Sequence, residues 1–305
     1  MVTHGNVQAL AKEWESPAQN GPPVTLLPEL EQLLSKRPPH VADAIRRVVT
    51  DVRPCVVLQT TRVGDVPLRG TFSDRLLRRP KPEPGLPISA SKFGGTPYAE
   101  QLSDVLDGRF IGQINFAQAT QALKSQERPI PAGMPEKGLL TVYRVPGVSH
   151  GRVRWYPDPD ESKAVRPPRF GPLAKYEARI EFKGSWSLQG LEWFDAVPHG
   201  DDELWNYMNK LEVPEVDVDG RGGHRLFGHP NQVLNEHNGI EPVRGRSKAI
   251  RDYALLWRID CDRAAGLSWG SNWLYVVIHQ EDLSRGSFQH AVVTGAGAKP
   301  RFVQA

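Results

Sequence analysis

The most constraining feature of this sequence is a strict alternation of apolar and charged side chains over residues 173–183. Five apolar residues alternate with five charged ones, the two sets being Ala174, Tyr176, Ala178, Ile180, Phe182 and Lys175, Glu177, Arg179, Glu181, Lys183. Successive side chains of a strand point to opposite faces, so this period of two predicts a strand with one buried and one hydrated face. Such strands are typical of antiparallel sheets.

Other segments predict further strands and a few helices. Nearly continuous apolar runs at 253–259 and 273–278 predict central strands covered on both faces, and shorter strands are predicted at 56–58 and 138–143. Helices are predicted within residues 1–52, at 115–124, and from Asp201, where three consecutive acids favour a helix N-terminus. Strands and helices do not alternate regularly, so the fold class is α+β, with an N-terminal helical segment at 1–52 and an α+β domain at 53–305.

Composition limits the classes of protein to consider. The chain has 27 prolines and 28 glycines among 305 residues, which disfavours helical bundles and solenoids. Its 38 basic and 35 acidic residues give a net charge of +3, too even to imply nucleic acid or a membrane as the partner. Cys55 and Cys261 lie in apolar runs and are predicted to be free thiols. With no apolar leader at the N-terminus, the chain is predicted to be cytoplasmic.

Several patterns resemble catalytic or metal sites. Residues 266–270 match G-x-S-x-G, and Asp282 and His290 follow in hydrolase order. That motif needs a strand turning into a helix, whereas here it leads into a predicted strand, so a strand connection is favoured. The cluster of His224, His229 and His237 with Glu236 has histidine spacings of five and eight, which fit no helical zinc motif. We therefore predict no metal and no cofactor.

An acidic stretch with aromatic residues is the candidate partner-binding surface. Residues 192–219 contain nine acids and one base, together with Trp193, Phe194, Trp205 and Tyr207. Opposite charges speed encounter with a basic partner, and buried aromatics carry affinity. The predicted contacts are Asp201, Asp202, Glu203, Trp205, Asp217 and Asp219. The alternative is a helix whose aromatics face the core and whose acids face water.

The most specific signal is a resemblance carried by ordered patches of sequence. Residues 91–98, SKFGGTPY, are similar to the "SKxGG-P" signature that opens the YwqG-like family, a bacterial domain of unknown function. Matching patches follow in the same order: FIGQIN at 110–115, KGLL at 137–140, HRLFGHP at 224–230, LLWRID at 255–260 with GLSWG at 266–270, and DL at 282–283. The sequence departs from the family at His229, where relatives have tyrosine, and at Ser271, where they have aspartate.

The resemblance implies an α+β domain built on a large, irregular, mostly antiparallel sheet, and it brings no reaction, cofactor or catalytic residue. Some members of such families look like immunity proteins. We therefore predict a cytoplasmic protein-binding domain, in its specific form an immunity protein that neutralises a toxin by occluding its surface. The alternative is a hydrolase with a polar pocket of Ser91, Lys92, His224 and His229. A structural adaptor would instead expose an apolar patch.

Overall fold

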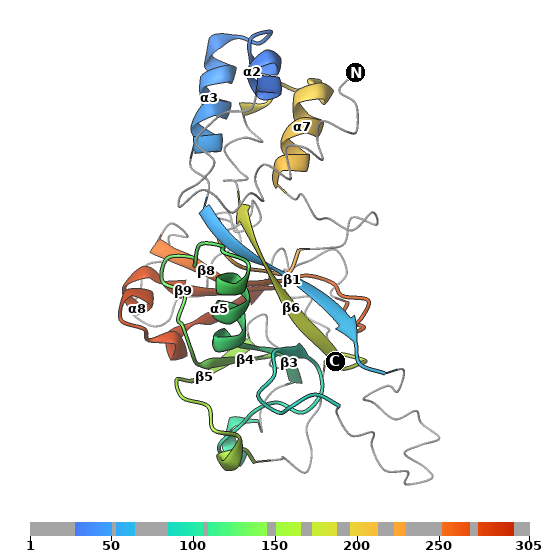
Figure 1. Cartoon of the computed structure of the whole chain (residues 1–305), viewed down its shortest axis with the longest axis vertical. Helices are drawn as coiled ribbons and strands as arrows, with labels where there is room; N and C mark the ends of the chain where they lie inside the picture. Colours follow the sequence, from blue (N-terminus) through green and yellow to red (C-terminus); the bar gives the residue numbers. More distant parts are fainter. Residues whose placement is uncertain are drawn as a thin grey trace, which may run out of the picture.

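The strands of this protein close into a barrel. The computed structural model describes residues 28–50, 53–64, 85–105, 109–144, 151–165, 173–187, 196–212, 223–229, 252–268 and 274–295. In these residues ten strands follow one another around the barrel in the order β1-β6-β2-β3-β4-β5-β10-β9-β8-β7, and every pairing is antiparallel (Figure 1). The strands are β1 Arg53–Arg62, β2 Lys92–Phe93, β3 Arg109–Asn115, β4 Leu139–Arg144, β5 Gly151–Tyr156, β6 Ala178–Ser187, β7 Arg225–Phe227, β8 Tyr253–Ile259, β9 Leu274–His279 and β10 Val292–Gly295.

The closed barrel corrects the expected large, irregular sheet. The α+β class and the antiparallel pairing are confirmed, but the short strand β7 pairs with both β1 and β8 and so joins the two ends of the sheet. A three-residue strand gives no periodic signal in the sequence. Closure of the barrel therefore depends on the pairing of β7 with β1 and β8, which no local sequence pattern predicts.

One core fills the barrel and extends to the helix α5, Phe116–Ser125. Inward side chains such as Val142, Ile180 and Trp257 belong to the same buried cluster as Phe116 and Leu123 of this helix. Asn115 begins the helix because its side-chain oxygen accepts the N–H of Ala117 at 3.1 Å. The FIGQIN segment at 110–115 thus ends at the residue that caps α5.

The alternating segment forms β6, but the strand begins later than predicted. From Ala178 the buried and exposed positions alternate as expected, while residues 173–176 form a bend ahead of the strand. Glu177 belongs to the charged set of the alternation, yet it is buried. A distant segment buries it, because the N–H groups of Gly85 and Leu86 donate to its carboxylate.

Three helices form a separate unit beyond the ends of β1 and β6 (Figure 1). They are α2 Pro28–Leu34, α3 Pro39–Thr50 and α7 Asp202–Glu212. Their apolar faces share a second core, to which Leu33, Ile45, Leu204 and Met208 contribute, and Trp186 of β6 packs against it. The helices α2 and α3 lie in the predicted N-terminal helical segment, whereas α7 joins them from much later in the chain.

Arg37 ties this helical unit together. Its Nε and Nη2 atoms donate to the two carboxylate oxygens of Asp201 at 2.8 and 2.7 Å, and Nη2 also donates to Glu203 at 3.0 Å. Nη1 donates to the carbonyl of Leu33, at the C-terminal end of α2, at 2.7 Å. The hydrogen bonds from Arg37 lower the pKa of Asp201.

We expect Arg37→Ala to lower the free energy of unfolding by about 1–2 kcal/mol, because a bidentate, largely buried pair is lost together with a helix-end contact. Urea denaturation at pH 7 measures this. The matched control is Arg46→Ala, which removes a more exposed arginine paired with Glu31 and should cost less than about 1 kcal/mol. Equal losses in both variants would contradict the structural role given to Arg37.

The remaining short helices are α8 Gln280–Ser284, η1 Leu102–Asp104, η2 Glu161–Lys163 and η5 Phe288–His290. Among the described residues, no helix has the length and apolar character needed to cross a membrane. Both cysteines are free thiols, as predicted, with Cys55 buried and Cys261 partly exposed.

Candidate functional site

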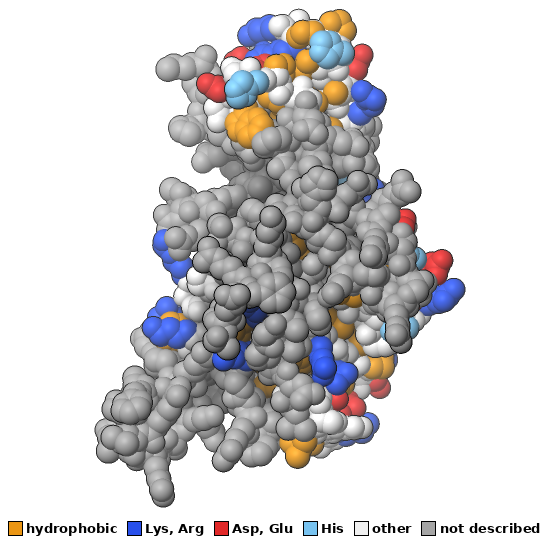
Figure 2. All heavy atoms as spheres, turned by 180° about the vertical axis from the view of Figure 1, so that it is seen from behind, with side chains coloured by type: hydrophobic (Ala, Val, Ile, Leu, Met, Phe, Trp, Pro, Cys, Tyr) orange, Lys and Arg blue, Asp and Glu red, His pale blue; other side chains and the backbone are white. Residues whose placement is uncertain are grey.

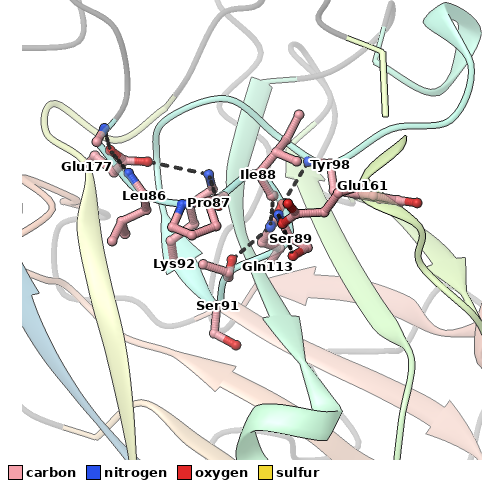
Figure 3. Close-up of polar contacts among 12 residues, drawn as sticks. Leu86, Pro87, Ile88, Ser89, Ser91, Lys92, Tyr98, Gln113, Glu161 and Glu177 are labelled. Atoms are coloured by element: carbon pink, nitrogen blue, oxygen red, sulfur yellow. Dashed lines mark hydrogen bonds and ion pairs between the residues drawn. The ribbon is translucent and has the colours of Figure 1, made fainter. Parts of the chain in front are cut away.

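The SKFGG segment, residues 91–95, is built around a buried ion pair (Figure 3). Lys92 on β2 places its Nζ atom 3.4 Å from Oε1 of Glu177, and the two side chains are 0% and 3% exposed. The same Nζ donates to the carbonyl of Pro87 at 3.2 Å. A buried charge is tolerated only when it is paired and hydrogen bonded, so each of these partners holds the other in place.

The carboxylate of Glu177 also fixes the chain that covers it. Its Oε2 atom accepts the main-chain N–H groups of Gly85 at 2.6 Å and Leu86 at 3.3 Å. Gly95 has φ of +70°, and a Cβ there would overlap Oε1 of Glu177. Glycine is therefore required both by the backbone conformation and by the close approach of the carboxylate.

Gln113, drawn in Figure 3, also binds the covering segment, residues 85–98, and Ser91 of that segment binds the barrel. The amide of Gln113 donates to the carbonyls of Ile88 and Ala90 at 2.7 and 2.8 Å, and its oxygen accepts the N–H of Tyr98 at 2.9 Å. The hydroxyl of Ser91 accepts the N–H of Asn115 at 2.8 Å. These polar groups fasten the segment 85–98 to the barrel, and the Ser91 oxygen serves as a structural acceptor.

A second buried network surrounds His224. The N–H of Asp260 donates to His224 Nδ1 at 3.1 Å, so the ring hydrogen lies on Nε2, which is 2.9 Å from Oδ2 of Asp262. Thr60 and the N–H of Ala265 donate to the same carboxylate. Burial raises the pKa of Asp262, but the hydrogen bond from His224, together with the bonds from Ala265 and Thr60, outweighs this effect and leaves the pKa lowered. Both ring nitrogens of His224 are occupied, so neither is available as a general base in this arrangement.

The structure brings the two matching loops together through an aromatic ring and not through the predicted polar pocket. The ring of Phe93 lies 4.7 Å from that of His224 and 5.4 Å from that of Trp257. Lys92 precedes Phe93 on the same strand, so its side chain points to the opposite face, toward Pro87 and Glu177. Lys92 and His224 therefore lie on different sides of the sheet.

His229 is held by its main chain. Its N–H donates to the hydroxyl of Ser187 at 2.7 Å, and its carbonyl accepts from Arg225 Nη2 at 2.8 Å. The residue is buried. The positive φ of Gly228, +78°, turns the chain into this position.

The serine, aspartate and histidine in hydrolase order do not assemble. His290 Nδ1 is 3.2 Å from Asp282 Oδ1, at the end of the barrel where α8 follows β9. Ser268 adjoins Leu267, which bridges to Asp262, and this turn lies at the other end of β9 because Ile259 pairs with Leu274. Within the described residues, no group of histidine, cysteine or acidic side chains could hold a metal ion. Glu236 and His237 lie outside those residues.

Four of the six predicted partner contacts lie at the start of α7. Asp201 and Glu203 bind Arg37, and Asp201 also accepts the N–H of Leu204 at 3.2 Å, as a helix cap does. Asp202 is exposed, and Trp205 is half-buried against the core of the helical unit. Asp217 and Asp219 lie outside the described residues.

Sequence reasoning did not single out Glu177, Asp262 or Gln113, which organise the two buried networks. Each occupies an unremarkable position: Glu177 in the charged set of a strand pattern, Asp262 in a turn, and Gln113 within the FIGQIN segment. Their partners come from distant parts of the chain, so no local spacing marks them. The family resemblance marked segments that take part in the two networks, but it did not mark Glu177, Asp262 or Gln113 as the residues that organise them.

Comparison with known proteins gives the family. A family model described as a domain of unknown function (DUF1963) matches residues 91–295, the stretch that contains every patch of the resemblance; its description does not carry the name YwqG-like. An alpha-(1->3)-arabinofuranosyltransferase of Mycobacterium tuberculosis (strain ATCC 25618 / H37Rv) is 28% identical over 171 residues, which cover 52% of this chain and 12% of that protein. The match thus spans a small part of the transferase. Because the family model covers more than half of the chain, this protein belongs to the DUF1963 family, whose function is unknown.

Proposed function

We propose that this protein is a binding domain that captures a basic protein partner through the N-terminal turn of α7. The observation that supports the proposal is the placement of Asp202, Glu203 and Trp205 at the start of a helix that stands outside the barrel (Figure 1). Acidic side chains there steer a basic partner, and a half-buried tryptophan offers an anchor.

The charges on the helical unit indicate which acid of α7 would contact a partner. Figure 2 shows acidic, basic and histidine side chains next to one another on this unit, so it is not a uniformly acidic surface. Arg37 offsets one of the two negative charges of Asp201 and Glu203. Asp202 is therefore the exposed acid of this turn that does not pair with Arg37, and we expect the surface that binds the partner to be small.

The specific form of the proposal is neutralisation of a toxin by occlusion of its surface. The toxin as partner comes from the family resemblance, and the candidate contact residues come from the acidic, aromatic stretch of the sequence. The hydrolase alternative is not retained as a second candidate, because Lys92 and His224 lie on different sides of the sheet and the nitrogens of His224 are both engaged.

Charge reversal at Asp202 tests the surface. The tagged full chain is used to isolate a stoichiometric partner from its host, and the affinity of that partner is then measured by calorimetry at low salt. We expect Asp202→Lys to weaken binding by about 5-fold or more, because reversing an interface charge replaces attraction with repulsion. Trp205→Ala is expected to weaken it further.

The matched control is Asp158→Lys, the same charge change on the barrel at a side chain that is 86% exposed. It should leave the affinity unchanged. Unchanged affinity in Asp202→Lys, or an equal loss of affinity in the control, would contradict the proposal that this surface binds the partner.

A further inference from the structure

The strand β7 closes the barrel with few pairings. It pairs with β1 at three positions and with β8 at two, Arg225 with Arg258 and Leu226 with Trp257. By contrast, every residue of β4 has a partner on both β3 and β5. The ring of strands is therefore joined at β7 by a short ladder, and the conformation of its three residues decides whether the ring stays closed.

Phe227 of β7 has a backbone conformation that bulky residues rarely adopt. Its φ is +57°, and among the non-glycine residues that the structure describes only Glu127 also has a positive φ. In a regular strand the side chains of Leu226 and Phe227 would point to opposite faces, yet both belong to the core of the barrel. The left-handed backbone at Phe227 accounts for this inward ring, so the closed strand contains a strained residue.

The neighbouring strand β8 is irregular at the same level. Its register against β9 shifts between Leu255 and Trp257, and Leu256 and Trp257 both lie in the barrel core. Trp257 is also the residue that pairs with Leu226. In the part of the chain that the structure describes, the buried Nε1–H of Trp257 has no hydrogen-bond acceptor. An indole nitrogen can only donate, so the closed barrel leaves this donor unsatisfied, whereas water would satisfy it in an open one.

Polar contacts fasten the chain on both sides of β7. Before the strand, the carbonyl of His224 accepts the N–H of Leu58 at 3.0 Å. After the strand, the N–H of His229 donates to the hydroxyl of Ser187 at 2.7 Å. A Cβ on Gly228 would overlap that hydroxyl, so glycine is needed for this contact. A few specific bonds thus hold β7 closed against its own strain.

The junction of β5 with β10 is also short but lacks these features. It consists of a single pair, Gly151 with Val293. Neither strand contains a residue with a positive φ. The ring of Trp155 on β5 lies 4.6 Å from the ring of Phe288, which packs the two sides of this junction together. Strain and an unsatisfied donor therefore coincide at β7 and not at this second junction.

We infer that β7 is a latch, the strand at which the barrel opens locally while the rest of the sheet stays folded. Two unfavourable features of the closed barrel, the strained Phe227 and the unsatisfied N–H of Trp257, are both relieved when β7 leaves β8. Few pairs break in this opening, and segments held by few contacts open at the lowest free energy. The opening uncovers inner side chains of β1 and β8, including Val56 and Trp257, which are both 0% exposed in the closed barrel.

Native-state hydrogen exchange of the full chain, read by mass spectrometry, measures this opening. We expect the amides of residues 225–227 to be about 100-fold or more less protected than those of β4. Ser187→Ala removes the acceptor for the N–H of His229 and should lower the protection of residues 225–227 by a further factor of about 5. The matched control is Ser91→Ala, which removes another buried hydroxyl that accepts a main-chain N–H, at 2.8 Å. It should leave the protection of residues 225–227 unchanged.

A second pair of variants tests the strain itself. Phe227→Gly and Phe227→Ala both remove the ring, but glycine adopts a positive φ freely and alanine does not. In an ordinary strand the alanine variant would be the more stable one. Here we expect residues 225–227 to be protected about 3-fold or more better in Phe227→Gly than in Phe227→Ala. Thermal unfolding shows which variants are folded, and the two serine variants decide the question if the Phe227 variants are not.

Three results would overturn the inference. The first is protection of residues 225–227 equal to that of β4. The second is an equal loss of protection in Ser187→Ala and Ser91→Ala, which would show that the contact after β7 does not hold the latch. The third is better protection in Phe227→Ala than in Phe227→Gly, which would show that the backbone at this residue is not strained. None of these results involves Asp202, so the inference and the proposed function fail separately.

Discussion

Replacing Glu177 with alanine is expected to lower the free energy of unfolding by about 3–5 kcal/mol, because the buried ammonium of Lys92 loses its counter-charge. The N–H groups of Gly85 and Leu86 lose their acceptor as well. Urea or thermal denaturation of the full chain at pH 7 measures the loss. Glu177→Gln keeps an oxygen for these N–H groups and should fall between the wild type and the alanine variant.

A control variant and a double variant test the reason given for this loss. Asp158→Ala removes the acid of an exposed lysine–aspartate pair, Lys137 with Asp158, and is expected to cost less than about 1 kcal/mol. Lys92→Met/Glu177→Leu removes both buried charges and should recover part of the stability lost in Glu177→Ala. A Glu177→Ala protein as stable as Asp158→Ala would show that the buried pair does not hold the covering segment.

Asp262→Ala is the second substitution with a large expected effect, about 2–4 kcal/mol of destabilisation at pH 7. The carboxylate is the shared acceptor for His224, Thr60 and the N–H of Ala265. Its removal leaves buried donors without a partner at the turn that closes one end of the barrel. Urea denaturation measures the loss of stability. Hydrogen exchange in residues 262–267 measures the local effect, and Asp282→Ala, which removes a buried aspartate at the opposite end of the barrel, is the control.

The same carboxylate predicts a pH dependence with a definite sign. The pKa of Asp262 is lower in the folded protein than its ordinary value, so the unfolded chain takes up a proton first as the pH falls. The stability from this group is therefore complete above about pH 4 and is lost as the pH drops through the folded pKa. Asp262→Asn should have a shallower loss of stability below pH 4. An unchanged slope would mean that this carboxylate is not stabilised by folding.

Local pattern predicted the elements of this fold whose signals lie within one stretch of chain. The apolar run at 253–259 is β8, and the acids from Asp201 mark the start of α7. The alternation after Ala178 gives the two faces of β6. In each case the periodicity or the cap is a property of neighbouring residues, so the sequence carries it directly.

Contacts between distant segments decided the rest. Closure depends on the three residues of β7, which are too few to show a period. Glu177 has the position of a hydrated side chain, and only the covering segment at 85–90 turns it into a buried partner of Lys92. Alternation along β2 directs Lys92 toward Glu177 and Phe93 toward His224, so Lys92 and His224 of the predicted pocket lie on different sides of the sheet.

The charge distribution shows the same division. The sequence by itself determined an antiparallel α+β protein with a net charge of +3 and the segments that would become strands and helices. Only the contacts between distant segments decided that Glu177 and Asp262 are buried while Lys175, Arg179 and Arg263 remain exposed. The physical reason is that burial and pairing are set by which distant segments meet, whereas composition and local period describe only one segment at a time.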